Sequence, residues 1–129
     1  MKIRLFVYGT LMKGFGLNDY LQDFNLLGRY ALSGFQMWSN GFYPMIKRHD
    51  ALSIVGELYE CDLEVWEKMK RCLDDIEGAY NREVVKINGE DAFIYVWKYS
   101  TKHLDLIKNG DFREYKRNKN ERFINYLFL

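Results

Sequence analysis

The 129-residue chain is long enough for one domain with a single buried core and too short for two ordinary domains. Its formal net charge is only +1, so no overall field draws it to nucleic acid or to an anionic membrane, and no apolar stretch is long enough to span one. The two cysteines, Cys61 and Cys72, are too few for a disulfide framework or a zinc cluster. We therefore expect a cytoplasmic protein, without a membrane segment, whose cysteines are small core residues.

The first part of the chain predicts strands joined by glycine-containing turns. Residues 2–8 (KIRLFVY) alternate and then become apolar at every position, which predicts a strand buried on both faces near its end. A loop bracketed by glycines follows over 9–16, and apolar residues at helix spacing predict a short helix within 17–24. Residues 26–39 and 42–46 predict two strands on either side of a Ser-Asn-Gly turn.

The second part begins with another strand and contains the clearest helix. Residues 52–61 predict a strand, in which Gly56 marks a bulge or a close approach of another backbone. Apolar residues recur every three or four positions over 62–77, which predicts a helix. Residues 80–87 and 91–99 predict a β-hairpin, because an Asn-Gly turn signal lies between them.

The C-terminal segment is basic and then apolar. We expect its ending, FINYLFL, to dock on the body of the protein. The basic residues before it are expected to form a solvated helix face, with a patch for a partner or nucleic acid as the alternative. These residues are Arg113, Lys116, Arg117, Lys119 and Arg122. Together the elements predict one α+β domain, residues 1–129, made mainly of short strands.

The loop after the first strand carries clustered glycines, whose backbone N–H groups can cradle an anion. Gly9 and Gly14 have the spacing of a Walker A loop, but Phe15 and Gly16 follow in place of Lys and Ser or Thr. The dinucleotide pattern also fails, because Asp19 stands where its last glycine belongs. These residues exclude a nucleotide site and leave two interpretations open, a cradle for another anion or a simple turn.

Glu77 is the strongest catalytic candidate that the residues alone provide. On a helical wheel at about 100° per residue, it falls inside the apolar arc, beside Trp66. Asp74 and Asp75 fall outside this arc and are expected to be solvated. A carboxylate that faces a core is hydrogen-bonded, paired, or raised in pKa, and a raised pKa suits a general base near neutral pH. The structural alternatives are a satisfied glutamate and a salt bridge to Arg82.

Other catalytic arrangements find no support in the sequence. His49 and His103 have no acidic or cysteine partner at metal-ligand spacing, so no metal site is expected. No serine stands in a nucleophile-elbow pattern, and neither cysteine has a neighbouring histidine. The sequence therefore shows no pattern of an activated serine or cysteine nucleophile.

Several motifs run in order through nearly the whole chain. They are FVYGTL at 6–11, Gly16 and Asn18, YPMI at 43–46, VGELYE at 55–60, LDDIEG at 73–78, Tyr80 and Arg82, the FIYVWKY strand, and GDFREY at 110–115. In these motifs the chain resembles the gamma-glutamylcyclotransferase family, in particular its compact branch, which includes gamma-glutamylamine cyclotransferases. The resemblance implies a mixed, barrel-like sheet flanked by a few helices.

The resemblance also implies a reaction that needs no metal or organic cofactor. The α-amine of a γ-glutamyl group attacks its own γ-carbonyl, closes 5-oxoproline and expels an amine, so the expected ligand is a small γ-glutamyl amine. The family carries its acid at the Glu-Gly step of LDDIEG, which implies that Glu77 is the catalytic residue. The implied substrate-binding groups are the backbone N–H groups of Gly9, Thr10 and Leu11 and the side chains of Tyr8 and Tyr80.

Within this resemblance, Tyr80 is expected to hydrogen-bond either Glu77 or the substrate. Only Gly78 and Ala79 separate these two residues, a shorter connection than in many relatives. Two other functions stay open. The first is a non-catalytic binding or interaction module that uses the basic C-terminal patch for a partner or, less expected, for nucleic acid. The second is a related enzyme that removes a γ-glutamyl protecting group. The sequence names neither the leaving amine nor the oligomeric state.

Overall fold

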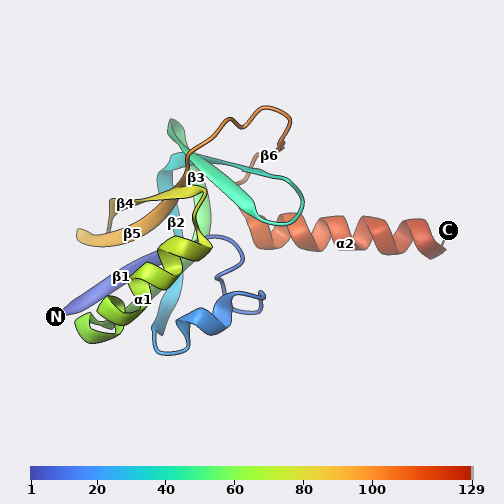
Figure 1. Cartoon of the computed structure of the whole chain (residues 1–129). Coiled ribbons are helices and arrows are strands. Elements are labelled where there is room, and N and C mark those ends of the chain that lie inside the picture. Colours follow the sequence, from blue (N-terminus) through green and yellow to red (C-terminus); the bar gives the residue numbers. More distant parts are fainter. Residues whose placement is uncertain (129) are drawn as a thin grey trace.

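The computed structural model describes residues 1–128 (Figure 1). Six strands form one sheet, which two α-helices and a short 3₁₀ helix accompany. In chain order the elements are β1 Lys2–Val7, the 3₁₀ helix Asn18–Leu21, β2 Asn25–Ser39, β3 Pro44–Asp62, α1 Leu63–Ile76, β4 Tyr80–Ile87, β5 Glu90–Trp97, β6 Asp105–Ile107 and α2 Phe112–Phe128. This mixed α+β arrangement confirms the predicted fold class.

The sheet has the strand order β4-β5-β1-β3-β2-β6 and curls into a half-barrel (Figure 1). Strand β1 lies between an antiparallel neighbour, β3, and a parallel one, β5. This central position explains why β1 becomes apolar on both faces, and Leu5 and Phe6 are fully buried. The C-terminal end of β1 therefore delivers the glycine loop to the middle of the sheet.

The two strands predicted over 42–46 and 52–61 are one strand, β3, so the predicted break between them was wrong. Pairing with β2 reaches into the polar stretch, where Lys47 lies opposite Gln36 and Arg48 opposite Phe35, and it resumes at Ser53 opposite Ser33 after a register shift. Residues 49–52 form an irregularity within β3 and have no apolar alternation, which is why the sequence pattern gave no sign that the strand continues. The close backbone approach predicted at Gly56 is confirmed, because a Cβ there would collide with the Val7 carbonyl oxygen.

Helix α1 packs on the sheet with the face that its periodicity predicted. Trp66 and Leu73 are buried, and the Trp66 ring stacks on Phe93 of β5 with centroids 4.8 Å apart. Cys61, at the end of β3, is buried as expected. Cys72 is exposed because it lies on the outward side of α1, so the expectation that both cysteines are core residues was half wrong.

Helix α2 starts on the body and then runs away from it (Figure 1). Phe112 in its first turn is fully buried, whereas Phe123, Ile124 and Leu127 are exposed. The expected docking of the apolar ending was therefore wrong for these three residues, and the last residue of that ending, 129, lies outside the described part of the chain. Among residues 1–128, no helix has the length and apolarity to cross a membrane.

Candidate active site

A cavity of about 250 Å³ opens where the loop after β1 meets the end of α1 and the starts of β3 and β4. Its lining includes every residue predicted for the site, namely Tyr8, Gly9, Thr10, Leu11, Glu77 and Tyr80. The rest of the lining is mainly apolar and aromatic, with Leu17, Tyr43, Pro44 and Tyr95 among it. Segments far apart in the sequence thus meet around one small chamber.

Glu77 follows the last residue of α1 and turns its carboxyl group into this cavity. Its backbone N–H still donates to the Leu73 carbonyl at 2.9 Å, so the helical turn fixes the direction of the side chain. Among residues 1–128 the Glu77 carboxyl has no hydrogen-bond or ion-pair partner. Burial without a compensating partner raises the pKa of Glu77 to about 7. At neutral pH the group can therefore both accept and return a proton.

Arg82 is not the partner of Glu77, so the predicted salt-bridge alternative was wrong. Its guanidinium instead donates twice to the carboxylate of Asp74, with both N–O distances 2.8 Å. The Tyr95 hydroxyl donates to the same carboxylate at 2.8 Å. Asp74 is therefore held by two side chains rather than simply solvated, while Asp75 is exposed as expected. These contacts neutralise Asp74 outside the cavity and leave Glu77 unpaired.

The loop after β1 presents backbone donors to the cavity. The carbonyls of Gly9 and Thr10 accept hydrogen bonds from the N–H groups of Met12 and Leu17, each at 3.0 Å. In contrast, the N–H groups of Gly9, Thr10 and Leu11 donate to no acceptor within residues 1–128. Backbone N–H groups that converge on one space can hold a carboxylate or an oxyanion.

Gly9 owes its identity to a close contact with Pro44. A Cβ on Gly9 would lie 2.5 Å from Cγ and 2.6 Å from Cδ of the Pro44 ring. The Tyr80 hydroxyl donates to the Pro44 carbonyl at 2.6 Å, so Tyr80 fixes the residue against which the loop rests. Tyr80 thus bonds to the protein backbone rather than to Glu77, the first of its two expected partners.

Both tyrosines of the predicted site are kept in their neutral form. Burial raises the pKa of Tyr8 and of Tyr80 above the ordinary value for a phenol, and nearby Glu77 adds to both shifts. The Tyr8 hydroxyl donates to the Tyr95 carbonyl at 2.5 Å. Because each hydroxyl has one proton and gives it to a backbone carbonyl, each phenol oxygen remains free only to accept.

The comparison with known families confirms the resemblance that the sequence motifs indicated. The sequence model of the family described as "Gamma-glutamyl cyclotransferase, AIG2-like" matches residues 5–114. The chain belongs to this family.

Several relatives resemble the chain over most of their length. A putative gamma-glutamylcyclotransferase of Pyrococcus horikoshii, PH0828, is 30% identical over 113 residues, which cover 87% of this chain and 92% of that protein. The family protein YtfP of Escherichia coli is 28% identical over 109 residues, which cover 84% of this chain and 95% of that one. The crystal structure of PH0828 superposes with a TM-score of 0.77 and covers 92% of this chain and 97% of that one.

Sequence reasoning assigned no site role to some residues that shape the cavity of this gamma-glutamyl cyclotransferase family member. Tyr43 and Pro44 line the cavity and belong to the YPMI motif. Asn18 donates to the Leu11 carbonyl at 2.8 Å and belongs to the motif pair of Gly16 and Asn18. The motifs themselves were the available signal, because they mark positions without stating what each one contacts.

The remaining candidates lie apart from the cavity. His49 and His103 are exposed, and residues 1–128 contain no cluster of three potential metal ligands. In the basic run, Arg113 and Lys116 donate to the carbonyls of Lys13 and Gly41. Part of the predicted basic face is therefore engaged within the molecule.

Proposed function

We propose that the protein cleaves a γ-glutamyl amine by intramolecular attack, releasing 5-oxoproline and a free amine. The observation that carries the proposal is that Glu77, with a pKa of about 7, lines the same cavity as the free N–H groups of Gly9, Thr10 and Leu11. A general base near neutral pH and a set of oxyanion donors are the two parts that this reaction requires.

In this mechanism the loop N–H groups bind the glutamyl part of the substrate, through its carboxylate or the γ-carbonyl oxygen. The neutral α-amine forms a bond to the γ-carbon, and the carbonyl oxygen gains negative charge, which the N–H donors stabilise. Glu77 takes one proton from the attacking nitrogen and gives it to the leaving nitrogen as the original C–N bond breaks. Holding the two ends of the substrate in contact supplies a large part of the rate enhancement.

The remaining lining residues support an uncharged environment for the leaving group. Glu77 is the only ionisable carboxyl, amine or guanidinium side chain among the described residues that line the cavity. No cation is available there to pair with a carboxylate on the leaving amine. The favoured substrate is therefore a γ-glutamyl amine rather than a γ-glutamyl amino acid.

A substrate panel tests this function. Purified protein is incubated with γ-glutamyl derivatives of small alkylamines, of diamines and of amino acids, and the release of 5-oxoproline is measured. We expect turnover of the alkylamine and diamine derivatives and weak turnover of the amino-acid derivatives. Failure to release 5-oxoproline from any member of the panel overturns the proposal.

A further inference from the structure

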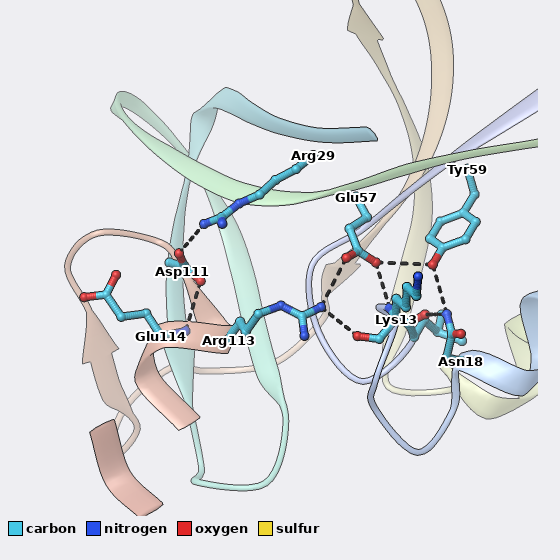
Figure 2. Close-up of polar contacts among 9 residues, drawn as sticks. Lys13, Asn18, Arg29, Glu57, Tyr59, Asp111, Arg113 and Glu114 are labelled. Atoms are coloured by element: carbon cyan, nitrogen blue, oxygen red, sulfur yellow. Dashed lines mark hydrogen bonds and ion pairs between the residues drawn. The ribbon is translucent and has the colours of Figure 1, made fainter. Parts of the chain in front are cut away.

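A partly buried cluster of ion pairs and hydrogen bonds contacts the glycine loop, and none of its charged residues lines the cavity (Figure 2). At its centre is Glu57 of β3, whose side chain is 13% exposed. Its carboxylate accepts hydrogen bonds from the Lys13 N–H at 2.8 Å, the Tyr59 hydroxyl at 3.2 Å and the Arg113 guanidinium at 3.1 Å. Glu57 therefore joins the loop, the sheet and helix α2 at one point.

Arg113 binds the other backbone group of the same loop residue. Its guanidinium donates to the Lys13 carbonyl at 2.7 Å (Figure 2). The same group lies 5.0 Å from the centroid of the Phe15 ring. Glu57 and Arg113 thus bind the N–H and the C=O of Lys13, respectively. This leaves residue 13 no freedom to rotate its peptide groups unless a charge-assisted hydrogen bond breaks.

The cluster also reaches the cavity side of the loop through Asn18. The Asn18 amide donates to the Leu11 carbonyl at 2.8 Å and to the Tyr59 hydroxyl at 3.0 Å. The Tyr59 hydroxyl in turn donates to Glu57. A continuous set of hydrogen bonds therefore runs from Glu57 to a backbone group beside the proposed donors.

The geometry of the peptide bond connects these anchors to the donors. A trans peptide group is planar, so a fixed carbonyl points the N–H of the next residue in the opposite direction. The anchored carbonyls of Gly9 and Thr10 thereby fix the N–H groups of Thr10 and Leu11. The hydrogen bonds of Glu57 and Arg113 to Lys13, here called the Lys13 clamp, and the bond from Asn18 to Leu11 hold the rest of the loop in the conformation that these bonds require.

We propose that Glu57 and Arg113 are positioning residues for the substrate-binding loop, an inference that rests on the proposed function. Neither residue lines the cavity, so neither touches the substrate. Their action is to hold the N–H donors at the place where the oxyanion forms. A basic surface patch for nucleic acid is a poorer account of Arg113, because its guanidinium is already bound to Glu57 and to Lys13.

The test compares Glu57→Ala and Arg113→Ala with the wild type. We expect kcat/KM for 5-oxoproline release to fall roughly ten- to a hundredfold in each, since a displacement of about 1 Å costs on the order of a hundredfold. The double variant should be little worse than either single variant, because the two residues act as one unit. The pH at which Glu77 titrates should not move.

Arg29→Ala is the matched control. It removes an ion pair of the same kind, Arg29 to Asp111 at 2.6 Å, from the start of the same helix without touching the loop (Figure 2). We expect its kcat/KM to equal that of the wild type. Amide hydrogen exchange of Met12, Phe15 and Leu17 supplies a second readout, which should accelerate in Glu57→Ala and stay unchanged in Arg29→Ala.

Wild-type kcat/KM and wild-type loop exchange in both alanine variants overturn the positioning role, as does an equal loss in Arg29→Ala. If an alanine variant does not fold, the same kinetic and exchange measurements are made on Glu57→Gln and Arg113→Lys. Glu57→Gln keeps an acceptor for the Lys13 N–H, so its kcat/KM should fall less than that of a folded Glu57→Ala protein. If the wild type turns over no substrate, the proposed function fails. In that case, wild-type amide exchange of the loop in Glu57→Ala and Arg113→Ala overturns the role of the Lys13 clamp in holding the loop.

Discussion

Glu77, at the end of α1, and Thr10, in the loop after β1, line one cavity although β2, β3 and α1 lie between them in the sequence. Glu77 supplies an unpaired carboxyl with a pKa of about 7, and the loop supplies a backbone N–H at Thr10 that no described residue accepts. A proton acceptor and a backbone N–H that can stabilise negative charge thus line the same small, mainly apolar space.

The pH dependence of catalysis should report the ionisation of Glu77. Because the base must be a carboxylate and the attacking amine must be neutral, kcat/KM should rise steeply with pH up to about 7 and less steeply above it, until the substrate amine is deprotonated. The substrate limb should move when the substrate changes, and the Glu77 limb should not. Carboxyl ¹³C NMR of the free protein should give the same pKa, and a value near 4.5 would contradict this assignment.

The same raised pKa predicts a pH-dependent cost to stability. The folded protein binds the Glu77 proton more tightly than the unfolded chain does. Protonation of Glu77 therefore stabilises the fold fully below about pH 4.5, and this stabilisation is lost as pH rises through about 7. At about 1.4 kcal/mol per unit of pKa, the loss is roughly 3 kcal/mol. In urea unfolding, the unfolding free energy of Glu77→Gln should therefore increase relative to that of the wild type between about pH 5 and pH 8. A constant difference would contradict the raised pKa.

Gly9→Ala should damage the site because its Cβ would strike the Pro44 ring at 2.5 Å. We expect a loss of about 1 to 3 kcal/mol in unfolding free energy from overpacking. The displaced loop should also lower kcat/KM on the order of a hundredfold. Gly16→Ala in the same loop is the control, because nothing lies within 4 Å of its added Cβ. Equal kinetics for the two variants would argue against the contact with Pro44.

Tyr80→Phe removes the hydroxyl that donates to the Pro44 carbonyl at 2.6 Å. The unfolding free energy should fall by about 1 to 3 kcal/mol, since the partner carbonyl is left unsatisfied. Pro44 should then support Gly9 less firmly, which should raise KM more than it lowers kcat. Tyr99→Phe, at an exposed position, serves as the control. A pure loss of kcat would instead indicate that the hydroxyl acts on the reacting atoms.

Much of the fold follows from local patterns that the sequence displays. The periodicity of α1 indicated its buried face, and the Asn-Gly signal located the β4–β5 hairpin. The continuity of β3 could not be predicted, because residues 49–52 have no apolar pattern and the pairing with β2 holds only the residues on either side of them. The exposed ending of α2 was missed for a related reason, since apolar composition does not show whether a surface is available to cover it.

In the candidate site, too, some features could be predicted from the sequence and others could not. The inward direction of Glu77 follows from its place on the helix, because the helical period alone sets which side chains share the apolar face. The contacts of Arg82 with Asp74, of Tyr80 with Pro44 and of Arg113 with Lys13 depend on the tertiary fold. Such partners compete for the same donors and acceptors, and only their relative positions in space decide which pairs form.

The most direct test of the central claim is 5-oxoproline release by Glu77→Gln and by Asp75→Asn at about pH 8 on one γ-glutamyl amine. Asp75 is an exposed carboxylate on the same helix and does not line the cavity, so its variant controls for the change in charge. We predict that Glu77→Gln loses roughly a hundredfold or more in kcat, the usual contribution of a general base, and that Asp75→Asn keeps full activity. Wild-type kcat in a folded Glu77→Gln protein would contradict the account.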